Sequence, residues 1–415
     1  MQRLRHLASS KPAILGRRLL KRRFLSMTLD LQFLDSRAVK SRCDAVSLSV
    51  LTASEKGAIA IVGSAALAQK CLTAIRAAGG EVPMLIEYDP RCWGKSVLGV
   101  PVVSPDDAFR LLPPDALVVS GVWSPNHRYR ETREWLNRFG FENVLPVNAV
   151  FWTFAAVIGA HYQFGEPTVY PANLSRIATF VQQLSDEASR SLVLAHLKWR
   201  VTLDPNHLPE PDREHVYFDW RLFRSREDIV VGDVGAFDGD SLRMFLRWHG
   251  NRFGCFHAFE PDPVSFSRLA DFKNSLAAFT ASRIKPIQAA VGESEGAMRV
   301  MASGKPGSKP GKHGEGTEVA SIRLDSYFAS ERVDYLKFDI EGAEWEALAG
   351  AWSVIERNRP IIGLAIYHRP TDIFDLPLAI IQRTQNYRYF VRSHDDDGID
   401  LVFYAVPAEC SSGAF

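Results

Sequence analysis

A strand followed by a glycine loop constrains this chain more than any other feature. The stretch IVVGDVGAFDGDS, residues 229–241, runs from β-branched apolar residues into a loop with Gly235, Gly239 and three aspartates. Glycines after a strand let backbone amides and a helix N-terminus come close to a ligand. The pattern predicts an α/β unit that binds a ligand at the carboxyl end of this strand.

Strand-like segments recur through the second half of the chain. They end at Asp233, Glu260, Val291, Asp339 and His368, and a last segment, IDLVFYAVP, precedes the C-terminus. Spacings of about 30 residues between the early segments fit crossover helices in a doubly wound sheet. A similar rhythm occurs earlier, with strands expected at 58–62, before residue 87, at 116–120 and at 143–146. The fold class is therefore α/β.

The length of 415 residues and a hydrophobic content of 46% suit two or three domains. We expect a basic, disordered tail over residues 1–27 and a smaller Rossmann-like domain over 50–150. A helical connector should follow over 151–227, packed between the sheets, and a larger Rossmann-like domain over 228–410. In the connector, Ser185 is expected to cap a helix that has Asp186 and Glu187 in its first turn.

The charge distribution argues against nucleic-acid binding. Residues 1–26 hold eight Lys or Arg and no acid, so the rest of the chain is mildly acidic although the net charge is +1. The tail could be a targeting segment, a membrane-surface anchor or an upstream extension of a chain that starts at Met27. The glycine-rich and lysine-rich stretch 303–316 is expected to form an exposed loop, with a lid as the alternative.

Neither a membrane span nor a disulfide framework is expected. The longest apolar run, residues 149–160, is far shorter than the roughly 20 residues that a bilayer requires. The five cysteines are scattered singly, without metal-ligand spacing. We therefore expect free thiols and a cytoplasmic protein, and no feature of the sequence fixes its oligomeric state.

The acids of the glycine loop oppose a dinucleotide. Two unit charges about 5 Å apart near a protein surface interact by roughly 3 kcal/mol, so Asp233, Asp238 and Asp240 would repel a pyrophosphate. S-adenosylmethionine has no phosphate, carries a sulfonium and an ammonium, and presents a ribose diol that suits a carboxylate. Glu260, in AFEPDP, lies 25 residues after Gly235 and supplies that carboxylate. The pattern favours S-adenosylmethionine as the cofactor.

Five segments together resemble the FkbM-type methyltransferases over residues 228–407. They are DVGAFDGDS, FEPDP, QAAVG, YLKFDIEGAEWEALAGA and YHRPTDIFDLP. The resemblance implies a Rossmann-like fold that uses S-adenosylmethionine, and O-methylation of a sugar or another small hydroxylated molecule. It also implies that the cofactor is lined by Asp233, Gly235, Ala236, Asp238, Gly239 and Glu260, with Ala289 and Ala290 near the adenine. Asp339 would lie near the methyl group.

Asp339, Glu341 and His368 are the candidate catalytic residues, because the carboxyl ends of the strands face the ligand crevice. His368 could take the proton of an acceptor hydroxyl while Asp339 orients that hydroxyl. Glu344 and Glu346 follow in a helix and are expected to be solvated. A divalent metal held by Asp339 and its neighbours stays possible, as in other members of the superfamily that this resemblance implies, but no ligand spacing requires one.

The first domain resembles the small Rossmann-like domain of bacterial sugar O-acyltransferases. Its loop GSAALA keeps Gly63 but has Ala65 and Ala68 at the other glycine places. It could bind nothing, bind a nucleotide-sugar or glycan, or bind NAD. Two alternatives to methyl transfer thus stay open, an NAD-dependent oxidoreductase built on this loop and an inactive methyltransferase-like scaffold.

Overall fold

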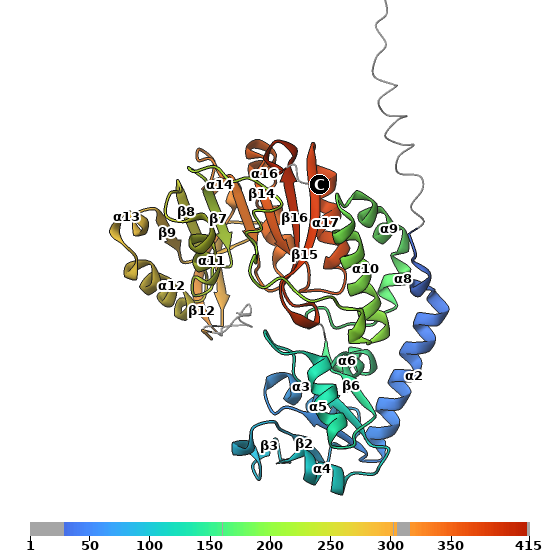
Figure 1. Ribbon diagram of the computed structural model, residues 1–415. Coiled ribbons are helices and arrows are strands. Elements are labelled where there is room, and N and C mark those ends of the chain that lie inside the picture. The colour runs from blue at the N-terminus through green and yellow to red at the C-terminus, as the bar shows by residue number, and fades with distance from the viewer. Residues whose placement is uncertain (1–28, 160, 302, 305–315, 413–415) are drawn as a thin grey trace, which may run out of the picture.

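The computed structural model describes residues 29–159, 161–301, 303–304 and 316–412. In this part of the chain two sheets lie one beyond the other, with helices between and around them (Figure 1). The expectations for the basic tail and for most of the insert 303–316 concern residues that lie outside the described ranges.

The smaller sheet has the strand order β3-β4-β2-β1-β5-β6. The strands are β1 (Ile59–Val62), β2 (Met84–Ile86), β3 (Ser96–Val97), β4 (Val100–Val103), β5 (Leu117–Ser120) and β6 (Val144–Pro146). All pairings are parallel except the β3–β4 hairpin. The central strands are buried along their whole length, which explains their continuous apolar sequence. The surrounding helices are α2 (Ser36–Glu55), α3 (Ala66–Ala77), α4 (Pro105–Leu111) and α5 (Tyr129–Arg138).

The larger sheet has seven strands in the order β15-β16-β14-β13-β7-β8-β9. They are β7 (Val230–Val234), β8 (Cys255–Phe259), β9 (Ile284–Ile287), β13 (Tyr335–Phe338), β14 (Ile361–Ala365), β15 (Tyr387–Ser393) and β16 (Leu401–Pro407). Only β16 runs antiparallel to its neighbours. A side sheet has the order β10-β12-β11, from β10 (Ala289–Val291), β11 (Gly296–Val300) and β12 (Thr317–Ile322). The strand order reverses at β7 and β13, so their carboxyl ends border a crevice.

Helices cover both faces of the larger sheet. They are α11 (Asp240–His249), α12 (Pro263–Ser275), α13 (Ala278–Ala281), α14 (Leu324–Tyr327), α15 (Glu344–Ala349), α16 (Trp352–Asn358) and α17 (Asp372–Arg383). One core joins Leu336 and Phe338 of β13 to α15, α16 and α17. The other core contains Tyr335 together with Phe245 of α11. Side chains of β13 therefore alternate between the two cores, as a strand in a doubly wound sheet requires.

The connector helices belong to both domains. They are α6 (Asn148–Thr153), α7 (Ala155–Ile158), α8 (Val169–Ala172), α9 (Leu174–Gln183) and α10 (Glu187–Thr202). Phe180 and Leu197 pack in the core of the larger sheet, whereas Trp199 packs in that of the smaller one. The connector therefore contributes to both cores, and the expected domain boundaries stay a prediction.

The N-cap of α10 is one residue later than expected. Asp186 caps the helix by accepting a hydrogen bond from the backbone N–H of Ser189 at 2.8 Å. The hydroxyl of Ser185 instead accepts from the backbone N–H of Tyr389 in β15 at 2.9 Å. Ser185 thus serves the sheet, because β15 supplies a free donor beside it.

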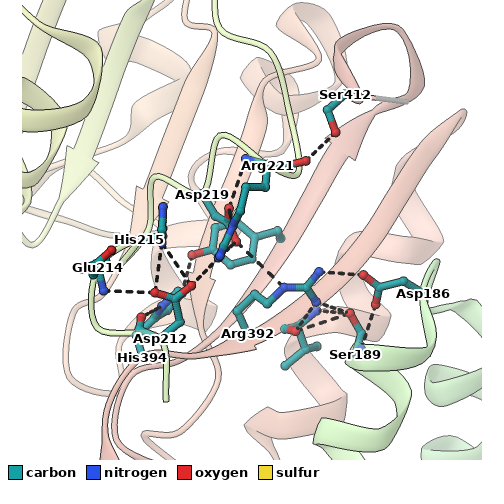
Figure 2. A network of polar contacts seen from close by, with 12 residues as sticks. Asp186, Ser189, Asp212, Glu214, His215, Asp219, Arg221, Arg392, His394 and Ser412 are labelled. Atoms are coloured by element: carbon teal, nitrogen blue, oxygen red, sulfur yellow. Dashed lines mark hydrogen bonds and ion pairs between the residues drawn. The ribbon is translucent and has the colours of Figure 1, made fainter. Parts of the chain in front are cut away.

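A polar network fastens the connector to the edge strand β15 (Figure 2). Arg392 of β15 pairs with Asp186 at 2.6 Å, and its hydrogen bond to the Ser189 hydroxyl measures 2.8 Å. The buried carboxylate of Asp219 lies 2.6 Å from the Arg221 guanidinium. Because these charges are paired and mostly shielded from water, they fix the position of α10 on the sheet.

The loops after β5 and β15 join the two sheets. Asp397 accepts a hydrogen bond from the backbone N–H of Tyr129 at 2.7 Å, and its carbonyl accepts from Trp123 Nε1 at 3.3 Å. Arg128 pairs with Asp396 at 2.8 Å.

No helix among the described residues is long and apolar enough to cross a membrane. All five cysteines are free thiols.

Candidate active site

The glycine loop after β7 comes close to the end of β13. Gly235 has φ +88°, and a Cβ at this position would lie 1.8 Å from the carbonyl oxygen of Asp339. The backbone N–H groups of Gly235 and Ala236 each donate to the carbonyl of Phe259 at 3.0 Å. Gly239, with φ +92°, is the N-cap of α11. Two positions of the loop thus need the left-handed backbone that glycine adopts without strain.

A buried ion pair supports this loop from below. Asp233 is fully buried at the end of β7, and its carboxylate lies 2.9 Å from Lys337 Nζ of β13. Lys337 also donates to the carbonyl of Gly235 at 2.7 Å, and the Ser241 hydroxyl donates to Asp233 at 2.5 Å. Burial opposes the charged ammonium, but the Asp233 carboxylate outweighs it and raises the pKa of Lys337. Asp233 therefore serves the loop as a supporting charge.

Glu260 follows β8 and holds the loop through hydrogen bonds. Its carboxylate accepts from the backbone N–H of Phe237 at 2.9 Å and from that of Asp262 at 2.8 Å. The side chain is buried, and burial raises the pKa of Glu260 to about 7. A carboxylate at the end of the second strand, beside the glycine loop, has the position from which a ribose diol is bound in Rossmann-like sites.

The remaining expected cofactor positions border the same region. Asp238 is half-buried and pairs with Arg243 at 2.8 Å. Ala289 and Ala290 are buried in β10 of the side sheet. The backbone N–H of Glu260 donates to the carbonyl of Ile287, two residues before Ala289. The segment expected at the adenine thus begins beside the carboxylate expected at the ribose.

His368 lies at the centre of a cluster of carboxylates after β13 and β14. Its side chain is fully buried. Nδ1 lies 2.8 Å from Glu344 Oε1, whereas Nε2 lies 3.4 Å from Asp339 Oδ1 and 3.5 Å from Glu341 Oε2. Glu341 has φ 60°, an uncommon conformation for a glutamate that concentrates at functional sites. We call Asp339, Glu341, Glu344 and His368 the His368 cluster.

The cluster changes the charge expected on His368. Burial opposes protonation of the ring, but the surrounding carboxylates, Glu344 foremost, raise the pKa of His368 to about 10. Burial likewise opposes ionisation of Glu344, yet His368 lowers the pKa of that carboxyl. Burial raises the pKa of Glu341. The carboxylates therefore favour the protonated ring, and the role of His368 as general base stays a prediction.

The sequence did not identify three residues of this region as part of the site, namely Glu344, Tyr162 and Lys337. Glu344 was expected in solvent but is buried, because its Oε1 meets both His368 and the backbone N–H of Ile340, the latter at 3.0 Å. Glu346 is half exposed, as expected for a residue on the outer face of α15. Tyr162, from the connector, places its ring 5.8 Å from that of His368. Lys337 lies inside an apolar strand, and neither this strand nor the DIEGAE motif after it indicates that Lys337 pairs with Asp233.

A small cavity lies at the junction of the two sheets. Its lining includes Arg128, Arg130, Glu210, Asp395 and Asp396. The lining residues belong neither to the glycine loop nor to the His368 cluster. The cavity is therefore separate from the crevice at the end of β7.

Comparison with known proteins agrees with this geometry. Residues 233–391 match the model of the methyltransferase FkbM domain. The crystal structure of methyltransferase FkbM from Methylobacillus flagellatus is similar to 89% of this chain and 100% of its own, with a TM-score of 0.71 and 21% identity. Fibrillarin from Aeropyrum pernix, with natively bound S-adenosyl-L-methionine, is similar at a TM-score of 0.27 and 13% identity, over 44% of this chain and 67% of its own. Comparison with curated proteins gives no match.

The larger sheet and its helices have a Rossmann-like methyltransferase fold. Residues 233–391 of this unit match the methyltransferase FkbM domain, which supports a methyltransferase of this type. The likeness to the Methylobacillus structure extends over both sheets, because it covers 89% of the chain.

Proposed function

We propose that this protein transfers the methyl group of S-adenosylmethionine to a hydroxyl of a sugar, a glycan or another small metabolite. Glu260 is the observation that carries the proposal. Its carboxylate is fixed by the backbone of the glycine loop at 2.9 Å, and it lies where a ribose diol would meet it. A carboxylate that is already held in place loses little freedom on binding a diol, so it favours the cofactor's ribose.

The charges of the crevice support a cationic cofactor. Lys337 is engaged by Asp233, and Asp238 is only partly offset by the half-exposed Arg243. Asp339 remains at the end of β13 with part of its side chain exposed. A sulfonium and an ammonium are stabilised by such carboxylates, whereas a pyrophosphate would be repelled.

The acceptor hydroxyl is assigned to Asp339 and Glu341. Their side chains are 21% and 23% exposed, whereas His368 and Glu344 are shielded from solvent. The two carboxylates can accept a hydrogen bond from a hydroxyl and orient its oxygen toward the methyl group. His368 then acts as a positioning residue that holds both carboxylates.

Methyl transfer can be tested with S-adenosylmethionine carrying a labelled methyl group and a pool of sugars and hydroxylated metabolites. We expect label on oxygen in a product formed by the natural protein. The Asp339→Asn variant should lose most of this transfer while it still binds S-adenosylhomocysteine. Glu346→Gln changes a half-exposed carboxylate nearby and should leave the transfer intact. Label on nitrogen or carbon would contradict O-methylation.

We also propose that the smaller domain recognises a sugar-nucleotide or glycan part of the acceptor. Glu87 follows β2, and Ser64 of the first glycine loop donates to it at 2.5 Å. This repeats, in the smaller sheet, the contact between the carboxylate of Glu260 and its own loop. A ribose or sugar hydroxyl could replace the Ser64 hydroxyl on this carboxylate.

Calorimetric titration with uridine diphosphate glucose tests this second role. We expect binding that weakens at least tenfold in Glu87→Gln and is unchanged in the exposed control Glu55→Gln. Binding of NAD instead would favour the oxidoreductase interpretation. Equal binding by all three proteins would place the ligand elsewhere.

A further inference from the structure

The His368 cluster contains a polar atom whose environment an ordinary ion-pair cluster does not explain. The His368 side chain is fully buried, and Nε2 has no hydrogen-bond partner. Its nearest acidic atoms are Asp339 Oδ1 at 3.4 Å and Glu341 Oε2 at 3.5 Å. Oε2 of Glu341 is likewise buried without a hydrogen bond. A buried polar atom without a partner is costly, so the space between these atoms calls for an occupant.

The distances suit a metal ion better than a proton. A hydrogen bond between a charged N–H and a carboxylate measures about 2.7 to 2.9 Å, shorter than either contact of Nε2. Two ligand atoms that are each about 2.1 Å from one ion stand roughly 3.0 to 3.4 Å apart. The contact of Nε2 with Asp339, at 3.4 Å, lies at the upper end of that range, and its contact with Glu341, at 3.5 Å, lies just above it.

Glu344 has the place of a carboxylate that orients a metal-bound histidine. Its Oε1 lies 2.8 Å from His368 Nδ1 and accepts from the backbone N–H groups of Ile340 and Gly342 at 3.0 and 3.3 Å. With these contacts made, Glu344 fixes the ring so that Nε2 points away from it. Metal-binding histidines are commonly held this way, by a carboxylate on the ring nitrogen that does not face the ion.

The charge count points in the same direction. The cluster places three carboxyl groups around one imidazole, and Asp372 adds a buried carboxyl group nearby whose oxygens have no hydrogen-bond partner. Nearby cations are committed elsewhere, since Lys337 pairs with Asp233 and Arg369 donates to the carbonyl of Gly342. A divalent cation would supply the missing positive charge.

We propose that Asp339, Glu341 and His368 bind one divalent transition-metal cation, with Glu344 orienting the histidine. Mixed imidazole and carboxylate ligands suit ions of the manganese-to-zinc series better than magnesium or calcium. The proposed binding of the metal ion rests on these contacts alone. Its use rests on the proposed function, because a cation here would lower the pKa of an acceptor hydroxyl.

Electron paramagnetic resonance and calorimetry with Mn²⁺ test the site in the full chain after chelator treatment. We expect one ion per chain. Affinity should fall at least tenfold in Glu341→Gln and in His368→Gln, and by about 10 to 100-fold in Glu344→Gln. Glu346→Gln, which removes a half-exposed carboxylate of the same helix, should bind like the natural protein. The Mn²⁺ signal of the natural protein alone decides the question if a variant fails to fold.

The outcomes separate this proposal from methyl transfer. Absence of stoichiometric Mn²⁺ and Zn²⁺ binding by the natural protein would overturn the metal site, as would equal affinity in Glu341→Gln and Glu346→Gln. S-adenosylhomocysteine titrated in parallel tests the cofactor. Binding of that ligand without metal would leave the proposed function standing, and metal binding without it would leave the metal site standing.

Discussion

The Cα of Gly235 faces the carbonyl oxygen of Asp339 so closely that a Cβ would lie 1.8 Å from it. This contact joins the expected cofactor loop to the strand end that carries the candidate catalytic carboxylate. Any side chain at position 235 must push the two apart. In the proposed reaction, the absence of a side chain at position 235 would therefore help to set the distance between the methyl donor and the acceptor.

Gly235→Ala should destabilise the protein strongly. A left-handed alanine costs about 1 to 2 kcal/mol, and the clash with Asp339 adds to it, so we expect a loss of more than about 3 kcal/mol in the free energy of unfolding measured with urea. Gly79→Ala is the matched control. Gly79 has φ +85°, lies just after α3 and has no atom within 4 Å of a Cβ, so only the backbone contribution should appear. Equal losses in the two variants would contradict the close contact.

Lys337→Met should leave the Asp233 carboxylate buried without its partner. Breaking one side of a buried pair typically costs about 3 to 5 kcal/mol, and we expect this loss in urea unfolding. The double variant with Asp233→Asn should recover part of it, because no charge then remains. If the free energy of unfolding of the double variant fell by the sum of the two single losses, the two residues would not be coupled.

Glu260→Ala should weaken binding of S-adenosylhomocysteine at least tenfold in calorimetry. Hydrogen bonds to a charged group contribute roughly 1.5 to 3 kcal/mol each, and the variant also frees the loop N–H of Phe237. The exposed Glu293→Ala serves as the control. An unchanged dissociation constant in Glu260→Ala would exclude this carboxylate as the ribose ligand.

Asp397 should make stability depend on pH. Burial raises the pKa of its carboxyl to about 7, above the roughly 3.9 of an unfolded aspartate. The folded state therefore keeps a proton that the unfolded state releases, and this contribution is fully present below about pH 4 and is lost as the pH rises through about 7. Asp397→Asn should remove this pH-dependent contribution. At pH 8 its free energy of unfolding should exceed that of the natural protein by on the order of 2 kcal/mol.

The asparagine variant suits the site, because Asp397 has φ 50° and asparagine tolerates this conformation. Urea unfolding at several pH values gives the difference between the two proteins. Asp115→Asn, at an exposed position, is the control, and its free energy of unfolding should change with pH as that of the natural protein does. A difference that does not change with pH would show that the carboxyl of Asp397 has the same pKa in the folded and unfolded states.

The sequence was informative where short-range patterns decide the structure. The strand ends at Asp233, Glu260 and Asp339 follow from apolar runs that stop at an acid, and the turn at Gly235 follows from the need for a left-handed backbone. The resemblance to the FkbM type is confirmed for residues 233–391. The acyltransferase-like interpretation of the first domain stays a prediction.

Long-range packing explains what could not be predicted. Glu344 belongs to a helix whose acids look solvated, and only the fold brings His368 against it. Tyr162 precedes His368 by more than 200 residues in the chain, so no local pattern connects the two rings. Strand β15 was not predicted. Arg392 is tolerated there because Asp186 of the connector neutralises it.

Calorimetric titration of the full chain with S-adenosylhomocysteine and, separately, with NAD tests the central claim most directly. We predict binding of one S-adenosylhomocysteine per chain and no heat of binding with NAD, because the acids of the glycine loop favour a cofactor without phosphate. Binding of NAD together with no binding of S-adenosylhomocysteine would contradict the assignment of this protein as an S-adenosylmethionine-dependent methyltransferase.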